Sequence, residues 1–353
     1  MSFQVTLQPS GRDFSVARDE PMLAAAIRQG IGMPYGCRDG ACGSCKSRLL
    51  AGRVLHGAHQ RKALSEVEEA AGLILPCCAT PQTDCVVEAR GVTAAGDFPV
   101  LKMPTRVISL GRPSADVALL HLQLPANQNF QYRAGQYIDF LLPGGLHRSY
   151  SMANAPGLLR DPPAIEFHIR HMPGGRFTDH VFGAMKAKDI LRVEGPFGSF
   201  FLRETSLKPI VLLASGTGLA PIKAIIEQVR ENARSPTPGQ AAPRPAILYW
   251  GCRSRADLYL DDWARQTAAE CPWLRYVPVL SKPDPGDAWL GRSGLVHLAV
   301  MADLPDLSGH EVYACGAPVM VDAAQRDFSA RCGLPPEAFF SDTFISEADK
   351  HGP

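Results

Sequence analysis

Three cysteines, Cys37, Cys42 and Cys45, stand close together at the spacing C-x4-C-x2-C, and a fourth candidate, Cys77, follows downstream. This is one of the spacings at which four cysteine thiolates hold a [2Fe–2S] cluster. Glycines at positions 36, 40 and 43 let the backbone curl around the sulfurs and aim N–H groups at them. A zinc site usually takes two close cysteine pairs, whereas this chain has one tight triplet and a distant single cysteine. The pattern therefore predicts an iron–sulfur centre.

The composition argues against several classes of partner and location. The chain has 353 residues, a formal net charge of +1 and 46% hydrophobic residues. This balance favours neither nucleic acid nor an anionic membrane surface as a partner. No apolar run reaches the length of about 18 residues expected of a membrane span, and the N-terminal stretch lacks the features of a signal peptide. Ten cysteines in so long a chain do not resemble a secreted disulfide framework, so a cytoplasmic location is expected.

The elements that must position the cysteines are predicted on both sides of them. Alternating apolar and polar residues predict short strands, and capping signals predict two helices. Ser65 and Glu68 have the spacing of a capping box at the start of the second helix. Together these elements predict a β-grasp domain over residues 1–92. Its strands are expected at 3–7, 14–16, 47–50 and 54–55, and its first helix between Asp19, as the cap, and Gly30.

Beyond residue 92 the pattern changes twice. A stretch rich in glycine and alanine at 93–101 is predicted to be a linker. Short strands between Pro and Gly turns then indicate an antiparallel barrel over 102–205, with one helix near 178–185. From 206 to 353 strands alternate with helices, which predicts a mostly parallel, Rossmann-like sheet. The strands are expected at 106–110, 117–124, 137–142, 149–152, 165–169, 190–193, 210–214, 246–250, 274–280, 312–315 and 339–344, and the later helices at 220–230, 257–269 and 318–330.

Three further motifs could bind nucleotide cofactors. Arg148-Ser149-Tyr150-Ser151 offers a flavin a cation for its phosphates, a flat ring and a hydroxyl near N5. In Gly174-Gly175-Arg176-Phe177-Thr178, glycines run into a helix N-terminus, whose N–H groups can cradle a pyrophosphate. The stretch Gly216-Thr217-Gly218, between a strand and a helix, lets the backbone approach a diphosphate in the same way. Each motif alone has a simpler explanation. The first is also compatible with an ordinary strand, the second with a glycine turn and a helix capped by Thr178, and the third with a structural turn.

In combination, these motifs resemble known families. Residues 1–92 are similar to plant-type ferredoxins. The two barrel motifs, followed by Gly195-Pro196-Phe197-Gly198, resemble the FAD-binding domain of the ferredoxin–NADP reductase superfamily. The Gly-Thr-Gly turn, the stretch 251–259 and the stretch 315–318 resemble the nicotinamide domain of that superfamily. The domain order resembles the reductase components of bacterial multicomponent oxygenases and the reductase for CDP-6-deoxy-3,4-glucoseen.

The resemblance implies which residues serve each cofactor. The family pattern selects Cys77 over Cys78 as the fourth iron ligand, and adjacent side chains of an extended segment would point to opposite sides. Four residues are expected where hydride is transferred: Ser151, Cys315, Asp342 and Phe344. The FAD and nicotinamide sites are expected to comprise Arg148, Ser149, Tyr150, Ser151, His168, Ile169, Arg170, Gly174, Gly175, Arg176, Phe177, Thr178, Gly216, Thr217, Gly218, Pro221, Gly251, Arg253, Ser254, Asp257, Tyr259, Cys315, Gly316 and Pro318.

The implied activity is electron transfer from NAD(P)H through FAD and the [2Fe–2S] cluster to a partner protein. The partner would be an oxygenase component or, alternatively, a sugar dehydratase. The resemblance favours NADH, while Arg253, Ser254 and Arg255 could bind the 2′-phosphate of NADPH. An iron–sulfur redox sensor would leave two nucleotide sites without a use, and a free-flavin or ferric reductase would need no dedicated partner. The sequence assigns no role to Cys78, Cys85, Cys252, Cys271 and Cys332.

Overall fold

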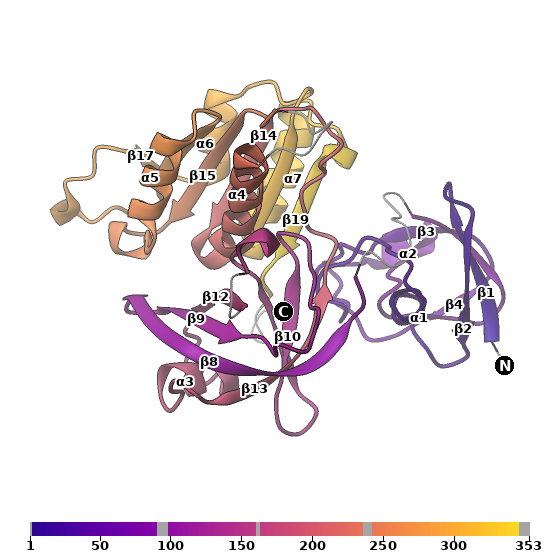
Figure 1. Cartoon of the computed structure of the whole chain (residues 1–353). Coiled ribbons are helices and arrows are strands. Elements are labelled where there is room, and N and C mark those ends of the chain that lie inside the picture. Colours follow the sequence, from indigo (N-terminus) through magenta and orange to yellow (C-terminus); the bar gives the residue numbers. More distant parts are fainter. Residues whose placement is uncertain (1, 90–97, 160–162, 236–241, 346–353) are drawn as a thin grey trace. The chain divides into compact units, whose positions relative to one another are not determined.

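The computed structural model of the chain describes residues 2–89, 98–159, 163–235 and 242–345 (Figure 1). Its internal contacts divide the chain into two compact units, Met1–Pro99 with Asp342–Pro353, and Val100–Ser341. Most of the predicted linker at 93–101 lies outside the described residues. Among the helices of the described residues, none is long and apolar enough to cross a bilayer.

The first unit contains a five-stranded sheet of order β2-β1-β7-β3-β5, in which β1 pairs antiparallel with β2 and parallel with β7. Buried side chains of β1, including Val5 and Leu7, share one core with Met22 and Leu23 of α1, which confirms the β-grasp prediction. The elements are β1 (Ser2–Gln8), β2 (Arg12–Ala17), α1 (Met22–Arg28), β3 (Ser47–Ala51), β4 (Val54–His56), α2 (Glu66–Ala70), β5 (Leu73–Ile74), β6 (Ala79–Pro81) and β7 (Cys85–Glu88).

Two local predictions for this unit have different outcomes. The capping box of α2 is present, because Ser65 accepts from the Glu68 backbone while the Glu68 side chain accepts from the Ser65 backbone. The predicted cap of α1 is wrong: the N-cap residue is Pro21, not Asp19, and no side chain caps this helix. The central strand β7 was not predicted, although its Cys-Val-Val run is typical of a strand.

The second unit begins with a six-stranded antiparallel barrel of order β11-β10-β13-β8-β9-β12. An antiparallel bridge between Met152 and Phe167 connects the two ends of this order, just beyond β11. Aromatic rings fill the barrel, and the Phe140 and Phe167 centroids are 5.2 Å apart. The elements are β8 (Leu101–Ser114), β9 (Val117–Gln123), β10 (Tyr137–Leu141), β11 (His147–Ser151), β12 (Ala164–Arg170), α3 (Arg176–Phe182) and β13 (Ile190–Phe197).

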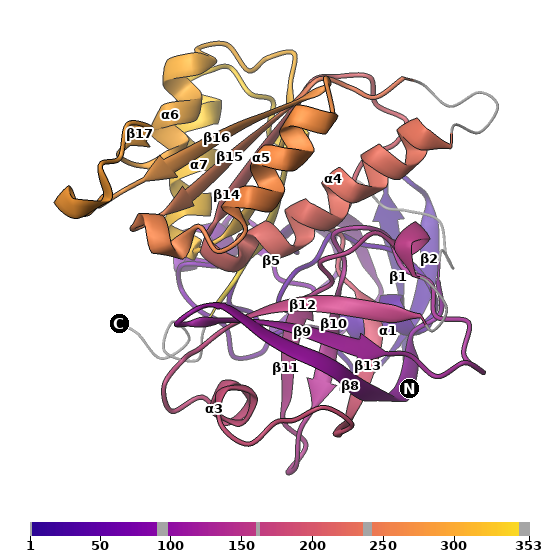
Figure 2. The same ribbon diagram turned by 60° about the vertical axis from the view of Figure 1, so that its left-hand side comes forward.

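A second sheet of this unit has the order β17-β16-β15-β14-β18-β19, and β14 pairs parallel with both β15 and β18. Helices α4 and α5 cover one face, and α6 and α7 cover the other (Figures 1 and 2). The elements are β14 (Ile210–Ser215), α4 (Leu219–Arg234), β15 (Ala246–Cys252), α5 (Asp261–Glu270), β16 (Leu274–Leu280), β17 (Arg292–Ser293), α6 (Val296–Asp303), β18 (Glu311–Gly316), α7 (Pro318–Arg331) and β19 (Phe339–Thr343).

The doubly covered sheet confirms the predicted fold class, and it adds α6, which was not predicted. The sequence of α6, Val-His-Leu-Ala-Val-Met-Ala-Asp, is nearly all apolar, so it has no polar stripe of helical period. The loops that follow β14, β15 and β18 leave the carboxyl edge of the sheet, where open α/β sheets bind ligands.

Candidate functional site

The four predicted iron ligands lie in the first unit as two pairs of sulfurs. The Sγ atoms of Cys45 and Cys77 are 3.3 Å apart and buried. Cys37 and Cys42 form the other pair, because the Cys42 N–H lies 3.3 Å from Cys37 Sγ and the Cys37 N–H lies 3.4 Å from Cys42 Sγ. No three metal-binding side chains of the described residues converge on one point, as a single ion would require. Two pairs suit a centre with two irons.

Backbone N–H groups surround the sulfurs of the Cys37–Cys42 pair. The Ala41 N–H donates to Cys37 Sγ and the Ser44 N–H donates to Cys42 Sγ, both at 3.4 Å. Such donors stabilise the negative charge of a thiolate-bound cluster. The loop needs Gly40, whose φ is +78° and whose added Cβ would lie 2.7 Å from Cys78 Sγ. The donor set therefore fits a [2Fe–2S] cluster held by Cys37, Cys42, Cys45 and Cys77.

The geometric argument that separated Cys77 from Cys78 is wrong. The segment is a turn rather than an extended strand, because the N–H groups of Cys78 and Ala79 both donate to the Leu75 carbonyl at 2.9 Å. The sulfurs of Cys77 and Cys78 therefore lie on the same side, 3.6 Å apart. The Cys77 sulfur lies 3.3 Å from that of Cys45, and the assignment of Cys77 as the ligand stays a prediction.

In the second unit, strand β11 carries the first flavin motif. Arg148 and Tyr150 alternate with Ser149 and Ser151, so each pair shares one face of the strand. The Ser149 hydroxyl donates to the buried carboxylate of Asp139 at 2.7 Å, which fixes one face. Tyr150 is half-buried against the barrel core, and burial raises the pKa of its hydroxyl.

The second flavin motif lies next to the first. The rings of Tyr150 and Phe177 are 5.3 Å apart, so the start of α3 packs against β11. Gly174 has a φ of +83° and open space around its missing side chain, whereas a Cβ on Gly175 would lie 2.7 Å from Thr178 Oγ1. Thr178 is not the helix cap: Gly175 is, and Thr178 donates to the Met172 carbonyl at 2.8 Å. The first-turn N–H groups at 176–178 have no partners within the helix and could hold phosphate oxygens.

The Gly216–Gly218 turn, called here the nucleotide turn, packs backbone against backbone with the loop at Cys315–Pro318. A Cβ on Gly218 would lie 2.2 Å from the Cys315 carbonyl oxygen, and one on Gly316 would lie 2.2 Å from Ser215 Oγ. Ser215 Oγ also accepts the Ala317 N–H at 2.9 Å. These contacts bring Gly216–Gly218 and Cys315–Pro318 together, as expected of one nicotinamide site. Three other residues predicted for this site are buried: Thr217, Pro221 and Cys315.

Several residues of the stretch 251–259, at the end of β15 and just after it, make structural contacts. Gly251 lets α6 approach, because its Cβ would lie 2.7 Å from Cβ of Val296. Ser254 and Asp257 cap each other in a capping box, with the Ser254 N–H donating to Asp257 at 2.9 Å. The Arg255 guanidinium donates to the Asp287 carbonyl at 3.3 Å, and Arg253 is exposed. Burial, followed by the charge of Asp257, raises the pKa of the neighbouring Cys252 thiol to about 12, so this thiol is neutral.

The stretch His168-Ile169-Arg170 connects the barrel to the sheet. Both ring nitrogens of His168 have partners, Tyr259 Oη at 2.8 Å and Glu166 Oε1 at 2.7 Å, and the ring is fully buried. Ile169 belongs to the barrel core. The Arg170 guanidinium lies over Gly216, where an added Cβ would be 3.2 Å from Nη2. Of these three side chains, Arg170 is therefore the one beside the nucleotide turn.

Several polar residues of this region were given no role by the sequence: Asp139, Glu166, Ser215, Lys223 and Glu227. One signal was available, because Lys223 and Glu227 are charged residues four apart on a helix whose neighbouring residues are apolar. Asp342 and Phe344, at and just beyond the end of β19, are grouped with the first unit, so their roles stay predictions.

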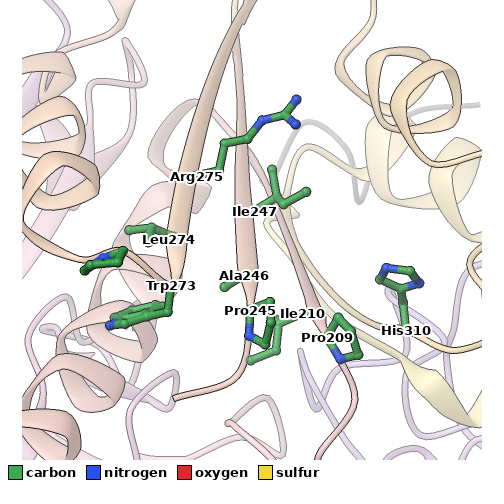
Figure 3. A pocket seen from close by; sticks show the side chains of 10 residues that line it. Pro209, Ile210, Pro245, Ala246, Ile247, Trp273, Leu274, Arg275 and His310 are labelled. Carbon is green, nitrogen blue, oxygen red and sulfur yellow. The ribbon is translucent and has the colours of Figure 1, made fainter. Parts of the chain in front are cut away.

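A cavity of about 380 Å³ lies at the amino ends of β14, β15 and β16, lined by Ile210, Ala246, Leu274 and their neighbours (Figure 3). Its walls are mostly apolar and include Pro209, Pro245 and Trp273. It lies at the sheet edge opposite the Gly216–Gly218 turn, so it is separate from the expected nucleotide site.

Comparisons with known proteins agree with these features. Three family models match: the 2Fe-2S iron-sulfur cluster binding domain over residues 5–82, the oxidoreductase FAD-binding domain over 104–202 and the oxidoreductase NAD-binding domain over 212–326. The CDP-6-deoxy-L-threo-D-glycero-4-hexulose-3-dehydrase reductase of Yersinia pseudotuberculosis is 39% identical, over 98% of this chain and 99% of its own length.

Two further matches are named after a phenol hydroxylase and a cytochrome P450. The phenol hydroxylase P5 protein of Acinetobacter pittii is 34% identical over 92% of this chain and 89% of its own. The crystal structure of the Amycolatopsis cytochrome P450 reductase GcoB superposes with a TM-score of 0.77 and 33% identity, covering 98% of this chain and 99% of that one.

Proposed function

Because the chain belongs to the family of NAD(P)H-dependent reductases that combine a [2Fe–2S] ferredoxin domain with FAD-binding and NAD-binding domains, we propose that it supplies electrons to an oxygenase component. Electrons pass from NAD(P)H through FAD to the cluster and on to a partner protein. Bound FAD supplies the conversion between hydride chemistry and the one-electron chemistry of the cluster. The observation that carries the oxygenase proposal is the near full-length match to oxygenase reductases.

The protein's own residues position these groups. Four thiols and their N–H donors hold the cluster, β11 and α3 would hold FAD, and the two packed glycine loops would receive the nicotinamide dinucleotide. Cys37 and Cys42 are partly exposed whereas Cys45 and Cys77 are buried, so the first pair is the side nearer to an electron acceptor.

A sugar dehydratase is the second candidate partner, supported by the 39% identity to the dehydrase reductase over nearly the whole chain. Reconstitution separates the two. The reduced protein is mixed with a purified hydroxylase of the phenol type or with a CDP-hexulose dehydrase, and saturable reoxidation is measured at rising acceptor concentration. Saturation with the dehydrase alone overturns the oxygenase proposal, and no saturation with either excludes both of these proteins as the dedicated partner. The ten cysteines form no disulfide, which supports a reducing cytoplasm as the location.

We expect the acceptor to dock over the cluster loop at 35–45. Arg38 and Asp39 in this loop, with Lys46 directly after it, give the docking face mixed charge. Transient electron-transfer interfaces are small, below about 1,200 Å². The change Arg38→Ala should slow delivery to the partner and weaken the salt dependence of that rate, because rim charges act mainly on association. Ferricyanide reduction, which can draw on the flavin directly, should change little.

The control for docking is Arg61→Ala, since the Arg61 side chain is 86% exposed in the same unit and pairs with Glu66 at the surface. Equal losses with ferricyanide and with the partner would mean that Arg38 serves folding or cluster assembly instead.

We expect the flavin to be FAD, because a helix N-terminus preceded by two glycines suits a pyrophosphate. Arg148→Ala should weaken flavin binding about ten- to hundredfold, since a charge-assisted phosphate contact is worth roughly 1.5–3 kcal/mol. Fluorescence of released flavin measures this, and chromatography identifies it. The matched control is Arg106→Ala on β8, whose guanidinium bonds to Gln123. Release of FMN, or equal flavin loss in both variants, would refute this assignment.

We propose NADH as the preferred donor. The carboxylates of Asp257 and Asp287 stand beside Ser254 and Arg255 and would repel a 2′-phosphate. The ratio of kcat/KM for NADH and NADPH should therefore favour NADH, and Arg253→Ala should change the NADH value little. A strong preference for NADPH that disappears in Arg253→Ala would overturn this choice.

A further inference from the structure

A buried network of charged and polar side chains joins the two cofactor-binding parts of the second unit. Lys223, on α4, donates to three acceptors: Glu227 Oε1 at 2.6 Å, Glu166 Oε2 at 3.2 Å and the Ala153 carbonyl at 3.2 Å. The side chains of Lys223 and Glu227 are each 7% exposed. An ammonium has three hydrogens to donate, so every one of them has a partner here.

The acceptors of Lys223 and Glu227 lie on the barrel, close to the flavin strand. Ala153 and Ala155 are two and four residues beyond Ser151, the last residue of β11. The Ala155 N–H donates to Glu227 Oε2 at 3.2 Å. Helix α4 begins directly after the Gly216–Gly218 turn. Helix α4 therefore follows the Gly216–Gly218 turn directly. One to two helical turns further along, its side chains bind the segment that follows the flavin strand β11.

A second connection reaches the same turn. The Tyr259 hydroxyl bonds to His168 of β12, and His168 bonds to Glu166, which also accepts from Lys223. The Tyr259 ring lies edge-on to Trp250 at 5.2 Å, and the Trp250 indole N–H donates to the Gly216 carbonyl at 2.9 Å. The Gly216 carbonyl of the nucleotide turn and helix α4, which follows that turn, are thus both connected to the barrel.

The charge states are consistent with this chain of donors. Burial alone would raise the pKa of Glu166, but hydrogen bonds from His121 and His168 and the charge of Lys223 lower it below its usual range. Burial lowers the pKa of His168, against the effect of Glu166, so the imidazole is neutral. A neutral His168 accepts from the Tyr259 hydroxyl at Nδ1 and donates from Nε2 to the Glu166 carboxylate.

We propose that Lys223, Glu227 and Glu166 are positioning residues for hydride transfer, which hold the nucleotide turn in register with the flavin strand. They do not touch the reacting atoms. Their effect depends on geometry, because a misplacement of about 1 Å between reacting groups can cost on the order of a hundredfold in rate. The proposal rests on the NAD(P)H-dependent activity and is independent of which protein accepts the electrons.

The test measures flavin reduction by NADH in stopped flow at saturating nucleotide. Lys223→Met should slow this step about ten- to hundredfold and increase its primary deuterium isotope effect, with NAD⁺ affinity changed less than about threefold. Hydrogen exchange at the Ala155 amide should become faster. Transfer from chemically reduced flavin to the cluster should be unchanged.

Two further variants separate positioning from stability. Arg244→Met breaks another buried ion pair of the same sheet, Arg244 Nη1 to Glu311 Oε2 at 2.8 Å, and should lower thermal stability without slowing flavin reduction. Lys223→Met combined with Glu227→Gln neutralises one of the two carboxylates that lose the ammonium, while Glu166 keeps its hydrogen bond from His168. The double variant should recover stability while flavin reduction stays slow. If Lys223→Met does not fold, Tyr259→Phe, which deletes a single hydroxyl, should still slow reduction by a few-fold. Normal reduction in a folded Lys223 variant, equal slowing in Arg244→Met, or full recovery in the double variant overturns the proposal.

Discussion

Replacing Cys45 by serine should remove the iron and the visible absorbance of the cluster, and with them all electron delivery to the partner protein. Cys45 is buried and its sulfur lies 3.3 Å from that of Cys77, so the site cannot recruit a solvent ligand in its place. Ferricyanide reduction by NADH should persist, because the predicted FAD-binding and nicotinamide-binding residues, between 148 and 318, belong to the other unit. Iron analysis and absorbance spectra measure the loss.

The matched control for this experiment is Cys85→Ser. Cys85 is buried in the same unit, but its sulfur contacts the carbonyls of Thr83 and Arg53 rather than another sulfur. Iron should be retained in this variant and in Cys78→Ser, and lost in Cys77→Ser. Retention in Cys77→Ser together with loss in Cys78→Ser would exchange the roles of these two neighbours.

Gly218→Ala should reduce kcat/KM for NADH about a hundredfold, the cost of shifting a reacting group by about 1 Å. The added methyl group would lie 2.2 Å from the Cys315 carbonyl oxygen, so the two nucleotide loops must separate. Neither loop can yield easily, because Ser215 and Ala317 are already joined by a hydrogen bond. Flavin and iron contents should stay normal, which places the defect at the nucleotide.

Gly309→Ala is the control for the glycine experiment. It lies in the same part of the chain, and an added Cβ meets no atom within 4 Å. This variant should use NADH as well as the parent protein does. If Gly218→Ala also kept full activity, the packed loops would not be the nucleotide site.

The sequence predicted cofactors better than it predicted contacts. Cysteine spacing and glycine-rich turns are short-range signals, because each depends on a few consecutive residues that must hold one ligand. The capping box at Ser65 was found for the same reason, since its partners are three residues apart. By contrast, α6 was missed because its nearly uniform apolar sequence has no helical period, and the helix is defined by the sheet it covers.

What the sequence determined by itself is the set of three cofactors and the order of the domains that bind them. Only the tertiary structure showed that the Cys77–Cys78 segment is a turn with both sulfurs on one side. It also showed that His168 joins Tyr259 to Glu166, and that Lys223 reaches Ala153, 70 residues away in the chain. Such contacts link residues that are distant in sequence, so no local pattern predicts them. Whether a lysine such as Lys223 is buried or exposed depends on which segments pack around it in the folded chain.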